Sequence, residues 1–401
     1  MGHHRRNEPT ERQPFYLRSA IADILCSMAD AEEPRTETSD ADDALIQEIM
    51  NRPSSFPTLR LGIELSGFAT EDVARVVGQE IGSCLFSVGK ILNLERLCRV
   101  VVTYDYNGTL ASLDRGFEAS KPLTPTQDDL AIGIAMTPAI IQDSEPRSVM
   151  VLNAYHMIVL AHRDNPEVAE WIQRMVHTLA HECGHVHDLG VQFKAFPNEM
   201  LKAKLSHKDN VLHFIASGCW EEYIASRLSA FMGHDFTTKD FENTFCGALE
   251  RARSRSDAAI RQYRMHHDLP RVIEEVTQEY KRLLVYASYL VGHTDGLGGS
   301  VQDLAPKAID LVEHTAYFKP IFEQLVQHLR AMHSTYGLWE TIEVFEPLKR
   351  LAYDLLKSGG MDIQQKPDGA SYVAIPFSPE TMPSVSEQFE FVSKSARKTS
   401  Q

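Results

Sequence analysis

The sequence predicts a predominantly helical α+β protein, with a small sheet beside one long helix and additional helices toward the C-terminus. Three observations predict this class. Apolar residues recur every three or four positions over most of the second half of the chain, β-branched runs gather in residues 99–154, and no internal repeat is present. Strands and helices are thus segregated along the chain, as in α+β folds.

The length and composition indicate several compact units. The chain has 401 residues, 43% of them hydrophobic, and a formal net charge of -15. We expect a flexible and helical N-terminal segment, a domain built on the sheet, a helical domain and a flexible tail, at 1–60, 61–235, 236–376 and 377–401. The negative charge disfavours binding to nucleic acid or to an anionic membrane, so protein or peptide partners are expected.

Six cysteines are spread without paired spacing, and no secretory signal pattern precedes them. They are Cys26, Cys84, Cys98, Cys183, Cys219 and Cys246. The longest apolar run, 149–161, is too short to span a bilayer and contains Asn153 and His156. We therefore expect reduced thiols in a cytoplasmic protein that does not cross a membrane. The oligomeric state cannot be predicted.

The first elements are predicted from periodicity. Residues 15–28 and 44–51 have helical spacing and flank an acidic linker that contains a proline. A longer helix is predicted over 69–93, opened by Thr70.

Short β-branched runs then predict a sheet. The runs lie at 99–106, 109–113, 130–141 and 148–154. Asn107–Gly108 predicts a hairpin turn after the first, and 143–146 a turn before the last. Residues 149–153 come shortly before the long helix and are the candidate for a sheet edge that an extended peptide could join through main-chain hydrogen bonds. An ordinary strand within the sheet is the alternative.

The chain is organised around a helix predicted over 165–190. An asparagine can cap it, Pro166 suits its first position, and apolar residues recur along it at helical spacing. Within it, His181, Glu182 and His185 form the pattern H-E-x-x-H. This helix is the predicted centre of the chemistry.

His181 and His185 lie one turn apart on the same helix face, so both imidazoles can bind one metal ion. Glu182 lies about 100° round the helix axis, which places its carboxylate beside such an ion as a general base for a water molecule. His177 is one turn earlier, and three histidines over two turns are too far apart to share one ion. The pattern predicts a zinc site with hydrolytic chemistry.

A third ligand must come from farther along the chain. Asp188 and Val191 stand where a metzincin has Gly and His, which excludes that class. Two adjacent carboxylates, Glu221 and Glu222, are candidates on the next predicted helix. Glu222 begins the pattern E-x-x-A-x-x-L-x-A.

Over about residues 165–230, the two helices resemble those of gluzincins, particularly the small intracellular zincins of the ImmA/IrrE type. The resemblance implies three ligands for Zn²⁺: His181, His185 and Glu222. It implies that Glu182 is the general base and that 61–235 form a zincin-like catalytic domain, a small sheet plus the metal-binding helix. Ser226 departs from the pattern, which usually has Asn or Asp there, and Glu221 stays an alternative ligand.

Zinc peptidases also stabilise the oxyanion with a nearby Tyr or His. We predict His293 in this catalytic role, since it lies at a predicted helix end followed by glycines. Tyr223, His213 and His314 are the competing candidates. We predict that Cys183 and Cys219 serve packing rather than metal binding.

The sequence thus predicts an intracellular zinc-dependent endopeptidase that hydrolyses peptide bonds in one or a few proteins. Two alternatives stay open: a zincin-like scaffold that binds a partner without turnover, and a zinc hydrolase of a non-peptide amide. Helices are predicted after the motif at 239–264, 270–291, 300–328 and 338–356. A strand at 372–377 and a mobile tail from 378 follow.

Overall fold

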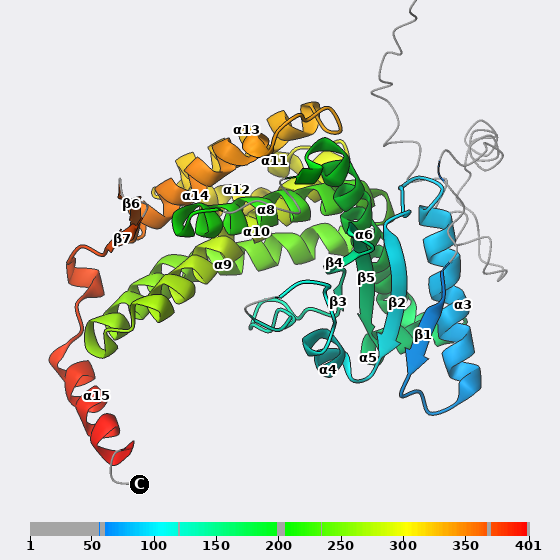
Figure 1. Ribbon diagram of the computed structural model, residues 1–401, viewed down its shortest axis with the longest axis horizontal. Coiled ribbons are helices and arrows are strands. Elements are labelled where there is room, and N and C mark those ends of the chain that lie inside the picture. Colours follow the sequence, from blue (N-terminus) through cyan, green and yellow to red (C-terminus); the bar gives the residue numbers. More distant parts are fainter. Residues whose placement is uncertain are drawn as a thin grey trace, which may run out of the picture. The chain divides into compact units, whose positions relative to one another are not determined.

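The computed structural model describes residue 56 and residues 61–118, 121–198, 205–233, 235–366 and 370–398. The helices predicted at 15–28 and 44–51 lie outside the described residues. The described chain is predominantly helical and contains a small mixed sheet (Figure 1). This confirms the predicted class, a predominantly helical α+β protein.

The chain divides into two compact units. The sheet unit comprises Met1–Gly190, Ala225–Thr238 and Gly292–Ser300, and the helical unit comprises Val191–Ile224, Lys239–Val291 and Val301–Gln401. The boundary predicted near 235 is close to the change of unit after Thr238. The chain changes unit inside long helices that the sequence shows as uninterrupted. The predicted domain bounds stay a prediction.

The sheet unit contains five strands in one sheet. They are β1 (Ile63–Ser66), β2 (Leu97–Thr103), β3 (Ala135–Met136), β4 (Ala139–Gln142) and β5 (Glu145–Asn153). The order is β1-β2-β5-β3, and β4 also pairs with β5. β1, β2 and β5 are parallel, whereas β3 and β4 run antiparallel to β5.

Two predictions about the strands are wrong. Residues 149–153 are not an edge, because β5 pairs with β2 on one side and with β3 and β4 on the other. Asn107–Gly108 does not form a hairpin turn: the Asp105 carboxylate accepts the Gly108 N–H and caps the short helix α4 (Tyr106–Ala111). The predicted turn before β5 is confirmed, with Asp143 and Ser144 at positive φ as in a two-residue hairpin.

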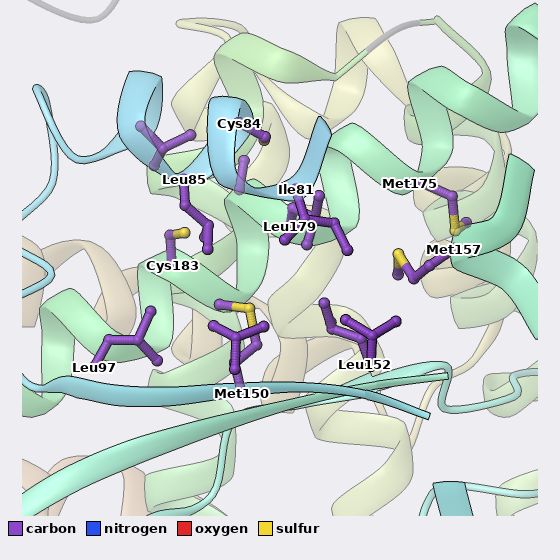
Figure 2. Packing of buried hydrophobic residues seen from close by; sticks show 14 of the residues in the cluster. Ile81, Cys84, Leu85, Leu97, Met150, Leu152, Met157, Met175, Leu179 and Cys183 are labelled. Atoms are coloured by element: carbon purple, nitrogen blue, oxygen red, sulfur yellow. The ribbon is translucent and has the colours of Figure 1, made fainter. Parts of the chain in front are cut away.

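One face of the sheet carries the main core of this unit. Helices α3 (Glu71–Val88) and α6 (Ala169–Ala195) contribute to it together with β2, β5, α5 (Ala154–Met157) and the 3₁₀ helix η1 (Ile158–His162). Figure 2 shows Ile81, Leu85 and Leu179 above Met150 and Leu152 of the sheet. Because side chains alternate along a strand, the valines at 149 and 151 face the opposite side, where they pack with α4.

The remaining described helices differ from their predicted ranges. Those predicted at 239–264 and 270–291 are longer, the range 300–328, predicted as helical with interruptions, contains the starts of three helices, and the helix predicted at 338–356 is shorter. These remaining helices are α8 (His207–Ser229), α9 (Asp235–His266), α10 (Leu269–Gly296), α11 (Val301–Leu304), α12 (Pro306–His314), α13 (Lys319–Ser334) and α14 (Glu346–Ser358), with 3₁₀ turns η3 (Ala230–Met232) and η4 (Ile342–Phe345). α10 continues past Gly292, the predicted end, because its last turn is buried against the end of α8: a Cβ at Gly296 would lie 2.4 Å from the Arg227 carbonyl oxygen.

The C-terminal residues also form regular structure. β6 (Asp362–Gln365) and β7 (Ser371–Ala374) pair as an antiparallel ribbon, which confirms the strand predicted near 372. The 3₁₀ turn η5 (Pro379–Thr381) and helix α15 (Val385–Lys398) follow where a tail without structure is predicted. Within the described ranges, no helix is long and apolar enough to cross a membrane.

Candidate metal site

The helix that carries the H-E-x-x-H pattern begins as predicted and ends later. The Asn165 side chain accepts the Glu167 N–H at 3.0 Å and caps the 3₁₀ turn η2 (Pro166–Val168), from which α6 continues. Gly190 does not end the helix, which runs to Ala195. A helix can continue through a glycine. Residues 191–195, VQFKA, contain neither proline nor glycine, so they can continue the helix.

The two histidines of the pattern face one another across one turn of α6. The His181 and His185 Nε2 atoms are 3.2 Å apart, and the rings are nearly perpendicular at 85°. Two nitrogens on a tetrahedral zinc, with bonds of about 2.0–2.1 Å, would be separated by about 3.3–3.4 Å. The pair is therefore arranged as two corners of such a site.

Glu222 completes a cluster with these histidines. One ligand atom from each of the three residues lies within 4.8 Å of the others. His181 is buried, whereas His185 and Glu222 are half-buried. Glu221 is exposed and does not belong to this cluster, so the structure brings together the carboxylate chosen from the E-x-x-A-x-x-L-x-A pattern.

Gly184 explains how α8 comes so close to α6. A Cβ at Gly184 would lie 2.8 Å from the Ala225 Cα and 3.2 Å from its carbonyl oxygen. Only a residue without a side chain permits this approach of two backbones. Glu222 lies three residues before Ala225 on α8, about one turn away, so the Gly184–Ala225 contact sets the distance between the carboxylate and the histidines.

The donor set fits zinc. Two imidazole nitrogens and one carboxylate are the protein ligands of many catalytic zinc sites, which leave one position for water or substrate. The 3.2 Å separation of the Nε2 atoms fits the same geometry. The residues present therefore suit the ion that the sequence predicts.

Glu182 is buried beside the ligand pair, with an exposed fraction of 6%. Its Oε2 atom accepts no hydrogen bond from the described residues. The hydroxyl of Tyr106, on α4, is likewise buried without a hydrogen-bond partner among them. Burial raises the pKa of Tyr106, and the negative charge of Glu182 raises it further, so the phenol and the carboxylate are electrostatic neighbours.

Tyr106 is a candidate that the sequence does not reveal. It lies 76 positions before Glu182 in a segment predicted to be a strand, and no spacing pattern links the two. Only the fold brings the charge of Glu182 close enough to affect the pKa of the Tyr106 phenol.

The predicted catalytic residue His293 is fully buried and packs against α6, one turn before His181. Its Nε2 atom lies 3.1 Å from the Thr238 hydroxyl, and its ring packs edge-on against His177 with centroids 5.8 Å apart. A Cβ at Gly233 would lie 2.3 Å from the His293 ring, so a glycine makes room for it. His177, as predicted, does not belong to the ligand cluster. The role of His293 stays a prediction, and the surroundings suit a residue that supports α6.

The competing candidates for the oxyanion role have other neighbours. Tyr223 is buried against Trp220, with ring centroids 5.7 Å apart, and His213 packs against Phe345 at 5.3 Å. His314 is exposed on α12, where its Nδ1 lies 2.7 Å from the Asp310 carbonyl oxygen.

The cysteines near the pattern serve packing, as predicted. Cys183 is fully buried in the core between α6, α3 and the sheet (Figure 2), and burial raises the pKa of its thiol well above the usual range. Burial raises the pKa of Cys219 to about 12. His187 has a structural role too, because its Nδ1 accepts the Asn93 N–H at 2.8 Å. Among the described residues, the cluster consists of the three predicted ligands.

Comparison with known proteins identified no relative. No protein-family model, curated protein or solved structure matches the chain.

Proposed function

We propose that this chain is a zinc-dependent endopeptidase of the gluzincin type, with a zincin-like core formed by the sheet and α6. One observation carries the proposal: the ligand atoms of His181, His185 and Glu222 lie within 4.8 Å of one another, and a buried carboxylate, Glu182, adjoins the first of them. A site that only binds a partner has no need for that carboxylate.

In the proposed reaction, His181, His185 and Glu222 hold the ion. When bound, zinc supplies a Lewis acid that lowers the pKa of a water molecule. Glu182 would accept a proton from the attacking water and pass it to the leaving amine, and its Oε2 atom is free of hydrogen bonds from the described residues. The proposed donor to the substrate oxygen that becomes negatively charged is Tyr106, whose buried hydroxyl has no hydrogen-bond partner among the described residues.

The proposed location is the cytoplasm. Five of the six cysteines lie in the described ranges, and all five are free thiols: Cys84, Cys98, Cys183, Cys219 and Cys246. Free thiols suit a reducing compartment. The proposed substrates are one or a few proteins, because a formal charge of -15 disfavours nucleic acid as a partner.

The test compares Glu182→Gln with the wild-type protein. Both should contain one zinc per chain by elemental analysis, and His181→Ala should contain none. When a proteome-derived peptide library is incubated with each protein, new N-termini identified by mass spectrometry should appear only with the wild type. The matched control is Glu167→Gln, which removes an exposed carboxylate at the start of the same helical segment and should leave cleavage unchanged.

Two results would overturn the proposal. If wild-type protein with stoichiometric zinc creates no new N-termini, a partner-binding scaffold or a hydrolase of non-peptide amides is the better description. If Glu182→Gln cleaves as fast as the wild type, Glu182 is not the base.

A further inference from the structure

Three parallel strands end at one edge of the sheet (Figure 1). β1, β2 and β5 run in the same direction, and their last paired residues are Ser66, Thr103 and Asn153. After β1 the chain enters α3 on the face that carries the main core, whereas after β2 it enters α4 on the opposite face. Open sheets of parallel strands bind ligands at such an edge, where connections from adjacent strands leave for opposite faces. This edge is therefore a candidate binding surface.

One aromatic residue from each strand end forms an aromatic row along this edge: Phe68, Tyr104 and Tyr155. The ring centroids of Phe68 and Tyr104 are 5.2 Å apart, and those of Tyr104 and Tyr155 are 4.7 Å apart, with the rings of each pair roughly perpendicular. Gly67 has a φ of +79°, and a Cβ there would lie 3.2 Å from the Tyr104 ring. A glycine thus lets the end of β1 turn close to the middle ring of the row.

Tyr155 is the exposed end of the aromatic row. Its exposed fraction is 69%, whereas Phe68 and Tyr104 are half-buried and pack against the main core. In a T-shaped pair, each ring keeps at least one face that the other does not cover. The Asn153 side chain also accepts the Tyr155 N–H at 3.1 Å, which fixes the backbone. The ring is therefore held in place with a face toward solvent, and a ligand would order it at little entropic cost.

A carboxylate leaves the neighbouring strand at the equivalent position. Thr103 and Asn153 are paired across β2 and β5, and Asp105 and Tyr155 each follow by two residues. Neighbouring strands lie about 4.8 Å apart, so the register brings these two residues side by side. Asp105 is exposed and forms no ion pair within the part of the chain that the structure describes. Its Oδ1 atom accepts the Gly108 N–H at 3.1 Å, which holds the carboxylate at the strand end.

The chemistry of this pair suits an arginine side chain. A guanidinium is planar, lies against aromatic faces and donates hydrogen bonds to a carboxylate from the same group. Glu71, exposed at the start of α3, adds negative charge at this edge, and the formal net charge of -15 attracts cations from a distance. Asp105 directly precedes Tyr106, the proposed donor to the substrate oxygen, so the surface adjoins the proposed catalytic residues along the chain.

We propose that Tyr155 and Asp105 bind an arginine side chain of the protein substrate: the guanidinium lies on the Tyr155 ring, and the Asp105 carboxylate accepts its hydrogen bonds. The inference rests on the proposed endopeptidase function and narrows its substrates to proteins with an accessible arginine. It adds two residues that the H-E-x-x-H pattern does not contain.

The test measures the binding of two fluorescein-labelled peptides to the full-length protein by fluorescence anisotropy. The peptides share one glycine–serine sequence and differ only where arginine in the first is replaced by citrulline, its neutral isostere, in the second. Every protein in the assay carries Glu182→Gln, so that the probes stay intact. The arginine peptide should bind more tightly than the citrulline peptide.

Tyr155→Ala and Asp105→Asn should each weaken binding of the arginine peptide by about 2–5-fold and leave the citrulline peptide unchanged. Both variants should fold, because Tyr155 is largely exposed and Asn keeps an acceptor for the Gly108 N–H. Tyr155→Phe keeps the ring and should retain the affinity. The matched control is Glu95→Gln, which removes an exposed carboxylate just before β2, at the opposite edge of the sheet, and should also retain it.

Three results would overturn the inference. They are equal binding of the two peptides, unchanged affinity of the arginine peptide in Tyr155→Ala or Asp105→Asn, and an equal loss in Glu95→Gln, which would show that binding follows net charge alone. Failure of the proposed function gives a different result: the wild-type protein creates no new N-termini, while the arginine peptide still binds through Tyr155 and Asp105.

Discussion

The two faces of α6 are held in place by different kinds of contact. On one face, Leu179 and Cys183 are fully buried against the sheet and α3, where many apolar side chains share the packing (Figure 2). On the opposite face, His181 and His185 converge near α8, and the separation of the two helices depends on one backbone approach at Gly184. The core face should therefore govern stability, whereas the ligand face should govern metal binding with little tolerance for added atoms.

The largest expected effect on stability comes from the core face. Leu179→Ala removes a fully buried side chain, and such changes cost about 2–5 kcal/mol of unfolding free energy. Urea unfolding followed by circular dichroism measures the loss. The zinc affinity of the folded fraction should not change. A variant that keeps its stability but loses zinc would contradict the separation of the two faces.

The next effect comes from the ligand face. Gly184→Ala places a methyl group 2.8 Å from the Ala225 Cα, so α6 and α8 must move apart. Overpacking of this kind costs about 1–3 kcal/mol, and the displaced carboxylate should no longer reach the histidines. Elemental analysis after dialysis should find less than stoichiometric zinc. Full zinc content would show that the site does not depend on this contact.

A smaller effect is expected at the start of the helix. Asn165→Ala removes the side chain that accepts the Glu167 N–H, and loss of such a cap costs about 1 kcal/mol. Zinc content should stay at one per chain, because His181 lies several turns away. Asn165→Asp keeps an acceptor at this position and should retain wild-type stability in the same unfolding assay. Equal losses in both variants would argue against the cap.

The smallest effect sharpens the comparison within one helix. Gly190→Ala adds the same methyl group as Gly184→Ala, but its nearest neighbour would be the Arg96 Cγ atom at an ordinary 3.7 Å. Alanine at a compatible helical position stabilises by about 0.4–1 kcal/mol, mainly by reducing the entropy of the unfolded chain. Thermal unfolding should show a small increase in midpoint with unchanged zinc. Loss of zinc in this variant would contradict the view that only the close backbone contact at Gly184 requires a glycine.

The order of elements along the chain could be predicted from the sequence, and errors arose where elements meet. Helical spacing predicted α3 and α6, and the β-branched run at 99–106 predicted β2. The hairpin at Asn107–Gly108 was wrong because the Asp105 cap competes with the turn. The edge position of 149–153 was wrong because pairing partners are chosen in three dimensions.

The sequence by itself predicted which three residues form the cluster. One-turn spacing places His181 and His185 on one face of a helix. The pattern that begins at Glu222 distinguished this residue from Glu221. Each prediction uses the fixed geometry of a single helix. Only the tertiary structure decided that Gly184 lets Ala225 approach, that the Tyr106 hydroxyl is buried without a hydrogen-bond partner among the described residues, and that β5 is paired on both sides. These contacts join residues from separate elements, and no local periodicity specifies which surfaces will meet.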